Sequence, residues 1–191
     1  MTADPAEIID FWLTEVGPER WYNASQDLDL EMRHRFGQDW RMARAGAYDD
    51  WILAPGPALA LLLLLDQFPR NMFRGQAEAF ASDAKALKLA KRALVLGHDL
   101  RTPEPERQFF YLPLMHSECL TDQERCCRLF HLRMSRTGED NLLHARVHRE
   151  IIRKFGRFPT RSESLGRPLS GAEAKWLETG GYHRVLEDLA E

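Results

Sequence analysis

The sequence lacks the features that mark several common functional classes. It has three cysteines, of which two are adjacent and none forms a C-x-x-C pair, and this argues against a disulfide framework and a zinc site. The 26 basic and 29 acidic residues leave a net charge of -3 with no long run of either sign, so we expect no nucleic-acid partner. The glycine-rich nucleotide loops and the G-x-S-x-G and H-E-x-x-H motifs are missing as well, so we expect no cofactor and no metal.

Long apolar runs are also missing. The stretch from Trp51 to Leu65 is interrupted by Pro55, Gly56 and Pro57, which leaves fewer than the ~18 to 20 apolar residues that a membrane span needs. The N-terminal segment MTADPAEIID is acidic and has no basic region followed by an apolar stretch. We therefore expect a cytoplasmic protein without a membrane partner, whose leucines lie in the core.

Strand signals are scarce, and helix signals recur along the whole chain. Asp4, Pro5 and Glu7 mark the start of a helix, and Ser170 and Glu173 form a capping-box pattern before Trp176. Apolar periodicity predicts the other helices, at 26–43, from Pro57, at 78–96, from about 103 to 118, after a capping box at 121–124, and at 138–155. Residues 181–191 can add a C-terminal helical tail.

These patterns predict an all-α fold of about eight helices. The connections between successive helices are short, which favours antiparallel hairpins stacked on one another. Such stacking resembles a tetratricopeptide array, although no 34-residue repeat is visible. The length of 191 residues suits one domain, 1–191.

Two Phe-Pro segments carry charge directly after apolar helices. In the first segment, Asp66 is followed by Phe68, Pro69 and Arg70 and, further on, by Arg74. In the second, Phe155 is followed by the segment Gly156 to Ser162, which contains Arg157, Phe158, Pro159 and Arg161. Because proline disfavours a helical conformation in the residue before it, we expect both phenylalanines to end their helices at similar corners. A buried carboxylate needs a cation, so Asp66 is expected to pair with one of these four arginines. Any arginine left unpaired could bind an anionic ligand.

Three histidines add to the candidate polar sites. Helical spacing places His116 on the same face as Phe109 and Leu112, near Pro113 and Glu118. His144 and His148 are four residues apart, but spacing fixes no third metal ligand. A core histidine held by hydrogen bonds is the expected role of His148.

Three segments in order suggest a family. They are LDQFPRN at 65–71, FYLPLMHSE at 110–118 and HREIIRKFGRFPTRS at 148–162. Together they resemble the bacterial family catalogued as domain of unknown function nine-two-four, over roughly residues 5–180. The resemblance implies an all-helical, tetratricopeptide-like fold and brings no catalytic residues. The chain departs from the family pattern at Thr160 and Ser162, where His and Asn are more usual.

The leading hypothesis is a helical-array protein that binds a small anionic ligand or an acidic peptide end in an inter-helix pocket. The candidate lining residues are Asp66, Arg70, Arg74, His116, Glu118, His148, Arg157 and Arg161. The first alternative is a hydrolase or lyase that uses His116 with Glu118 or His148 for acid/base catalysis. The second is a partner-binding scaffold without a pocket, which a patch of exposed aromatics such as Trp21, Tyr22 and Trp51 would favour. Whether the protein is an enzyme stays open.

Overall fold

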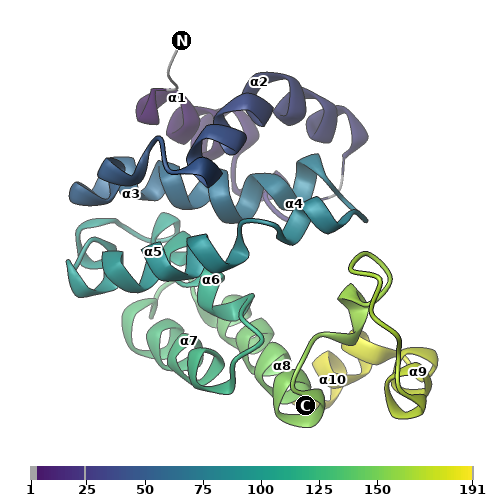
Figure 1. The fold of residues 1–191 in the computed structure, drawn as a ribbon. Coiled ribbons are helices and arrows are strands. Elements are labelled where there is room, and N and C mark those ends of the chain that lie inside the picture. Colours follow the sequence, from purple (N-terminus) through teal and green to yellow (C-terminus); the bar gives the residue numbers. More distant parts are fainter. Residues whose placement is uncertain (1–3, 24, 191) are drawn as a thin grey trace. The chain divides into compact units, whose positions relative to one another are not determined.

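The protein is helical throughout its ordered elements. The computed structural model describes residues 4–23 and 25–190, and within these ranges every regular element is a helix. The chain divides into two compact units, Met1–Pro113 and Leu114–Glu191, which are described separately below (Figure 1). The all-α fold is confirmed, while the single domain and the tetratricopeptide-like stacking stay predictions. Glu191, the end of the expected tail, lies outside the described residues.

The α-helices and the helical segments between them have the following bounds. The first unit contains α1 (Pro5–Asp10), α2 (Gln26–Ala45), α3 (Pro55–Leu62), α4 (Phe68–Met72) and α5 (Asp83–Val95). The second contains α7 (Leu120–Arg133), α8 (Glu139–Phe155), α9 (Gly171–Glu178) and α10 (Gly181–Ala190), and α6 (Leu112–Met115) lies at the boundary. Two π-helical segments, η1 (Phe11–Val16) and η4 (Leu63–Gln67), and the 3-10 segments Pro18–Arg20, Asp49–Leu53, Ala77–Phe80, Asp99–Arg101, Glu106–Phe110 and Pro159–Arg161 complete them.

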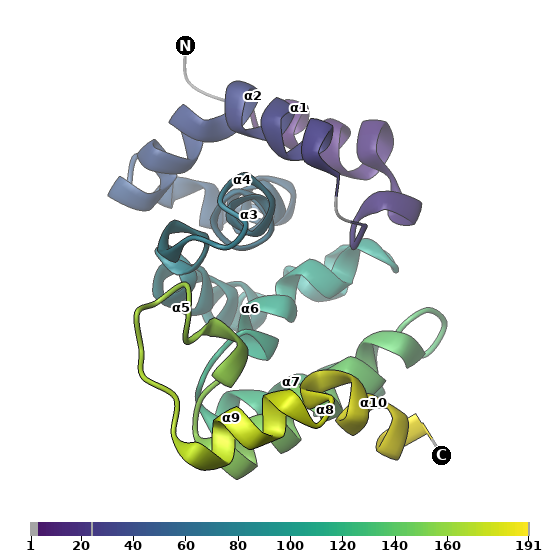
Figure 2. The same ribbon diagram turned by 90° about the vertical axis from the view of Figure 1, so that its right-hand side faces the viewer.

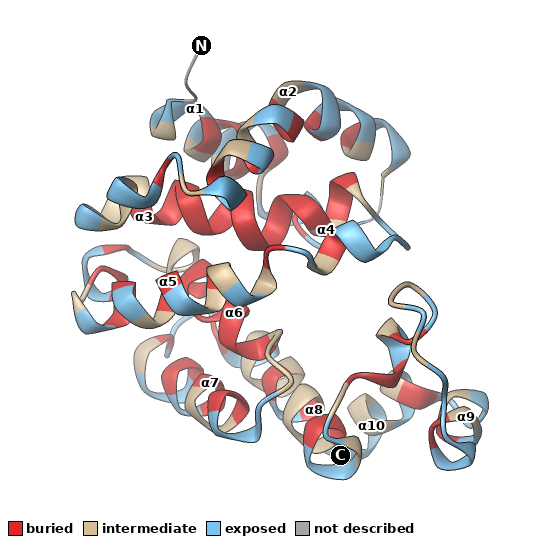
Figure 3. Cartoon of the chain, in the orientation of Figure 1, coloured by how far each residue is buried: buried red, intermediate tan, exposed pale blue. Residues whose placement is uncertain are grey.

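A continuous helical path forms the centre of the first unit. It runs through α3, η4 and α4 (Figure 1), and Figure 2 shows it nearly end-on with α1 and α2 alongside. Residues 58–69 are all buried, as the red ribbon of Figure 3 shows. The run of leucines is therefore core on every side, because α1 and α2 cover the path along its length.

The prediction that Phe68 ends a helix is wrong. Phe68 has helical torsions, φ -59 and ψ -41, and its N–H donates to the carbonyl of Leu63, five residues back. This π-helical hydrogen bond shifts the hydrogen-bonding register of the helix just before Pro69. Pro69 then takes an N-terminal position in α4, where the missing N–H of proline costs little. The chain therefore continues in a helical course through Phe68 and Pro69.

The second Phe-Pro segment forms the corner that the sequence predicts. Gly156 ends α8 in the left-handed region, at φ 70, a conformation that glycine adopts at low cost. Phe158 is extended, with φ -89 and ψ 107, and Pro159 opens the short 3-10 segment after it. The two Phe-Pro segments thus differ, because only the second has a glycine stop before its phenylalanine.

Several helix boundaries also differ from the sequence prediction. The helix expected from about 103 to 118 is broken into the 3-10 segment Glu106–Phe110 and the short α6. The cap of α7 is Cys119 instead of Thr121, and the segment 77–80 forms a 3-10 turn before α5 begins at Asp83. None of the described helices combines the length and the apolar character that crossing a membrane requires.

The second unit is built around α8. α7 and α10 both pack against α8, and α9 contacts α10 (Figure 2). α9 begins with the capping box that the sequence predicts, since the Ser170 side chain accepts from the Glu173 N–H and the Glu173 side chain accepts from the Ser170 N–H. Ile151 and Ile152 of α8 and Trp176 of α9 belong to one buried cluster, against which Val185 of α10 packs.

Candidate functional site

Asp66 lies in the π-helical segment η4 of the first unit. It is 1% exposed, and the side-chain amide of Gln67 donates to its Oδ2. The hydroxyl of Tyr22 donates to Oε1 of Gln108. The side chain of Tyr22 is otherwise largely open to solvent, since the residue is 62% exposed. The buried carboxylate of Asp66 therefore has at least one neutral donor, the side-chain amide of the next residue.

Arg70 and Arg74 each bind a carboxylate other than Asp66. Nη2 of Arg70 lies 2.8 Å from both oxygens of Asp83, and the guanidinium stacks over Phe80 at 4.7 Å. Nε and Nη2 of Arg74 lie 2.9 and 3.0 Å from the two oxygens of Asp29. These ion pairs connect α4 to α5 and to α2.

His148 of α8 has a tautomer fixed by its surroundings. Its Nδ1 lies 3.0 Å from the carbonyl oxygen of Met115. Because a carbonyl only accepts, Nδ1 carries the proton and Nε2 presents a lone pair. Burial is the main cause that lowers the pKa of His148 to about 3, and the charges of His116 and Arg161 act in the same direction. The imidazole is therefore neutral at neutral pH.

His116 lies just beyond the end of α6, half-buried. Its ring centroid is 6.3 Å from that of His148, and its carbonyl oxygen accepts from Nη2 of Arg161 at 2.9 Å. The Arg161 guanidinium also stacks over Phe158 at 4.5 Å. His144 contacts the hydroxyl of Tyr182 through Nδ1 at 2.6 Å. No group of three metal-ligating side chains occurs among residues 4–23 and 25–190.

Glu118 and Arg157 brace the corner between α8 and α9. Both oxygens of Glu118 accept from Arg167, at 2.8 and 2.9 Å, and Oε1 also accepts from the Phe158 N–H at 2.8 Å. Burial alone would raise the pKa of Glu118, but the Arg167 and Phe158 hydrogen bonds lower it. Arg157 makes a bidentate pair with Glu173, at 2.6 and 2.7 Å, and this pair is the main cause that lowers the pKa of Glu173 to about 2.

The structure divides the predicted site residues between its two units. Three lie in the first unit, Asp66, Arg70 and Arg74, and five in the second, His116, Glu118, His148, Arg157 and Arg161. The sequence analysis missed two of their partners, Arg167 and Glu173. The capping-box pattern placed Glu173 at a helix start, but no spacing rule connects it to Arg157, sixteen residues before it.

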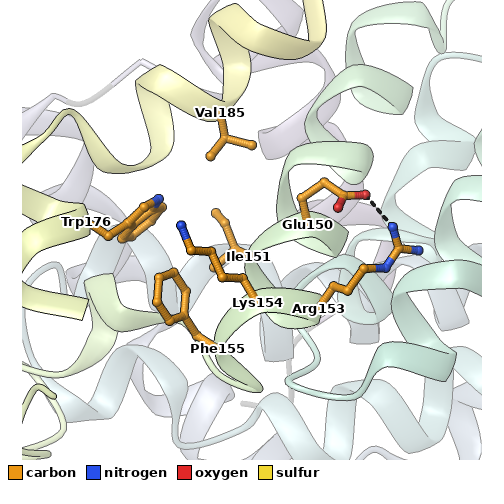
Figure 4. Close-up of a pocket in the computed structure, with 7 residues that line it drawn as sticks. All are labelled: Glu150, Ile151, Arg153, Lys154, Phe155, Trp176 and Val185. Atoms are coloured by element: carbon orange, nitrogen blue, oxygen red, sulfur yellow. Dashed lines mark hydrogen bonds and ion pairs between the residues drawn. The ribbon is translucent and has the colours of Figure 1, made fainter. Parts of the chain in front are cut away.

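The second unit contains a hollow between α8, α9 and α10 that the sequence analysis also missed. Its volume is about 210 Å³, and Figure 4 shows the side chains around it. Its lining residues are Glu150, Ile151, Arg153, Lys154, Phe155, Trp176 and Val185. The walls are mostly apolar, and Ile151 and Trp176 are only 3% and 8% exposed. A hollow of this size suits a single small molecule or one side chain, because sites for drug-sized ligands start at about 300 Å³.

Of the charged side chains that line the hollow, Glu150 and Arg153 form ion pairs within the described part of the chain and Lys154 does not. Oε1 of Glu150 accepts from Arg153 at 2.9 Å and from Arg149 at 3.0 Å, and Arg153 also binds Glu124 at 2.7 Å. The ammonium of Lys154 lies over the Phe155 ring, 5.2 Å from its centroid, and no carboxylate of the described residues pairs with it. In Figure 4 the ammonium lies among the apolar side chains of the hollow. The hollow therefore combines apolar walls with one cation that lacks a counter-ion.

Comparison with known proteins identifies the family. Residues 8–181 match the family described as bacterial protein of unknown function (DUF924). The chain belongs to the DUF924 family. A solved structure of the protein of unknown function ATU0120 from Agrobacterium tumefaciens is 39% identical, with a TM-score of 0.85, and the match covers 92% of this chain and 97% of that one. The comparison with curated proteins gave no match. The DUF924 resemblance of the sequence is thus confirmed, and it supplies a fold without a reaction.

Proposed function

We propose that this DUF924 protein binds a small organic anion in the hollow between α8, α9 and α10, with Lys154 as the cation that recognises it. The observation that carries this proposal is the ammonium of Lys154, which has no carboxylate partner among the described residues and stands at the edge of a mainly apolar lining. Lys154 is exposed, so water reaches its ammonium, and the apolar walls on one side of it add a contact surface for the carbon skeleton of an organic anion.

The pairing of the neighbouring charges supports the same proposal. Glu150 and Lys154 are four residues apart on α8, a spacing at which a glutamate and a lysine usually attract each other. Here Glu150 is held by Arg149 and Arg153. The lysine is therefore available to a ligand, and the rim as a whole carries an excess of positive charge.

The predicted residues of the second unit have a supporting role in this proposal. Arg157 and Glu173 fix the start of α9, the helix that carries Trp176 into the hollow. Glu118 fixes Phe158 through its N–H, and thereby the corner that follows α8. We propose that these residues position the walls of the site, while Lys154 contacts the ligand. In the first unit, Asp66, Arg70 and Arg74 stabilise the core and its covering helices.

The two alternative functions have weaker support. Glu118 already accepts three hydrogen bonds, and His148, with a pKa of about 3, is a weak base near neutral pH, where general-base catalysis favours a pKa close to 7. Among the aromatic residues named for a scaffold surface, Tyr22 is 62% exposed, but Trp21 is only 5% exposed and Trp51 stacks on Tyr48 at 4.4 Å, so the three do not form a broad exposed patch. Anion binding is therefore the function with the stronger support.

Isothermal titration calorimetry with benzoate as the probe tests the proposal. Lys154→Met keeps the aliphatic stem and removes the charge. It should weaken benzoate binding about 10-fold, the lower end of the ~1.5 to 3 kcal/mol for a hydrogen bond to a charged group, because water reaches the exposed lysine. The matched control is Lys175→Met, which removes an exposed lysine of α9 that does not line the hollow. Equal affinity of the wild type and Lys154→Met, or the absence of binding to the wild type, would overturn the proposal.

A further inference from the structure

We infer that the anion is a monocarboxylate with a branched or aromatic apolar group and without a neighbouring ammonium. This inference rests on the proposed function and specifies its ligand. Three features of the hollow carry it: its single unpaired cation, its apolar floor and its volume.

The single cation favours a ligand with one negative charge. Lys154 is the charged group of the lining whose partner is an aromatic ring instead of a carboxylate, whereas Arg153 is bound by Glu124 and Glu150. A ligand with two or three charges, such as phosphate, would bring more charge than one lysine compensates into a place with apolar walls. Burying uncompensated charge is costly, so a carboxylate fits better than a phosphate.

The floor of the hollow favours an apolar group beside that carboxylate. Ile151 and Trp176 belong to the buried cluster of the second unit, and Phe155 and Val185 pack against it. Each methylene that leaves water for such a surface contributes ~0.8 kcal/mol, about a fourfold gain in affinity. The volume of about 210 Å³ corresponds to roughly seven waters of ~30 Å³ each. A carboxylic acid with about eight non-hydrogen atoms therefore suits its size.

The rim disfavours an ammonium next to the carboxylate. Glu150 is the carboxylate that lines the hollow, and two arginines already bind it. An α-ammonium would also lie close to Lys154 and meet repulsion. Amino acids with free ammonium groups should therefore bind more weakly than the same carbon skeleton without nitrogen.

A matched set of ligands tests this inference by calorimetry on the full-length protein. The set contains 4-methylpentanoate, leucine, which is the same skeleton with an α-ammonium, 2-hydroxy-4-methylpentanoate, acetate and inorganic phosphate. We expect 4-methylpentanoate to bind more than 30-fold tighter than acetate or phosphate and more than 10-fold tighter than leucine. The matched ligand 2-hydroxy-4-methylpentanoate should recover most of the loss, because its hydroxyl replaces the ammonium at nearly the same size and carries no charge.

Two variants separate the failure of the inference from the failure of the proposed function. Val185→Ser changes a half-buried wall residue and should reduce the preference for 4-methylpentanoate over acetate by about 3-fold or more. If acetate, phosphate or leucine binds as tightly as 4-methylpentanoate, and all depend on Lys154, the ligand class is wrong while anion binding stands. If 2-hydroxy-4-methylpentanoate binds as weakly as leucine, repulsion of the α-ammonium is not the cause of the weak binding of leucine. If binding persists in Lys154→Met, or no anion binds, both fail.

Discussion

The neutral state of His148 predicts a specific dependence of stability on pH. In the folded protein its pKa is lowered to about 3, mainly by burial, whereas in the unfolded chain it is about 6.5. Between these values the unfolded chain binds a proton that the folded protein does not. Folding stability must therefore fall as the pH falls from about 6.5 towards about 3.

The slope of this loss is about 1.4 kcal/mol per pH unit for one group. Between pH 7 and pH 5, His148 should therefore contribute a loss of about 2 kcal/mol. Glu118 and Glu173 also have lowered pKa values. The stability that these two carboxylates contribute is present above the pKa of a glutamate in the unfolded chain, about 4.3, and is lost only below it. Their effect therefore does not overlap with the pH range from 5 to 7.

Urea denaturation of the wild type and of His148→Asn at pH 7, 6 and 5 measures this effect. Asparagine can keep a donor for the Met115 carbonyl but does not titrate, so the variant should lose about 2 kcal/mol less than the wild type between pH 7 and pH 5. His131→Asn, at an exposed position of α7, is the control and should behave like the wild type. Equal pH dependence of His148→Asn and the wild type, or an NMR titration of His148 with a midpoint near 6.5, would refute the reasoning.

Three further predictions concern stability and are checked by the same denaturation assay at pH 7. Gly156→Ala should lower the free energy of unfolding by about 1 kcal/mol, because residue 156 has a φ of 70. The control Gly171→Ala, at a position with open space and no positive φ, should leave it unchanged. Equal effects of the two substitutions would contradict this prediction. Arg70→Met should lower the free energy of unfolding by about 1 to 2 kcal/mol, since the half-buried guanidinium binds Asp83 and stacks on Phe80. Arg74→Met should lower it by less than about 1 kcal/mol, because the Arg74 side chain is 49% exposed. Ser170→Ala should cost about 1 kcal/mol through the loss of the α9 cap, and Ser170→Thr should restore most of it.

The parts of the fold that the sequence predicted depend on local chemistry. The Asp4 side chain caps α1, the Ser170 capping box begins α9 and Gly156 ends α8, as the sequence pattern indicates. In each case the signal and its effect lie within a few residues. The long stripes of apolar residues likewise placed α2 and α8 within about two residues at each end.

The course of the chain at Phe68 could not be predicted in this way. The proline rule gives the same expectation for Phe68 and Phe158, yet only Phe158 is extended. At Phe68 a π-helical hydrogen bond to Leu63, within a path covered by α1 and α2, replaces the usual stop. Packing around the leucine run thus overrides a local preference.

The candidate site could be predicted only in part for a similar reason. The sequence marked Arg157 as a cation at a corner, but its partner Glu173 comes from another helix. Lys154 gave no signal of its own, because its spacing from Glu150 indicates an ordinary surface ion pair. Its unpaired state depends on Arg149 and Arg153, which already bind that glutamate, and on α9 and α10, which supply the walls.

The most direct test of the anion-binding hollow is an NMR titration of the wild-type protein with 4-methylpentanoate. We predict saturable shifts of the side-chain ammonium of Lys154, the indole N–H of Trp176 and the backbone amides of Ile151 and Val185. The shifts of Trp176 should disappear in Lys154→Met and persist in Lys175→Met. Saturable shifts confined to residues outside the hollow, or none at all, would contradict the proposed site.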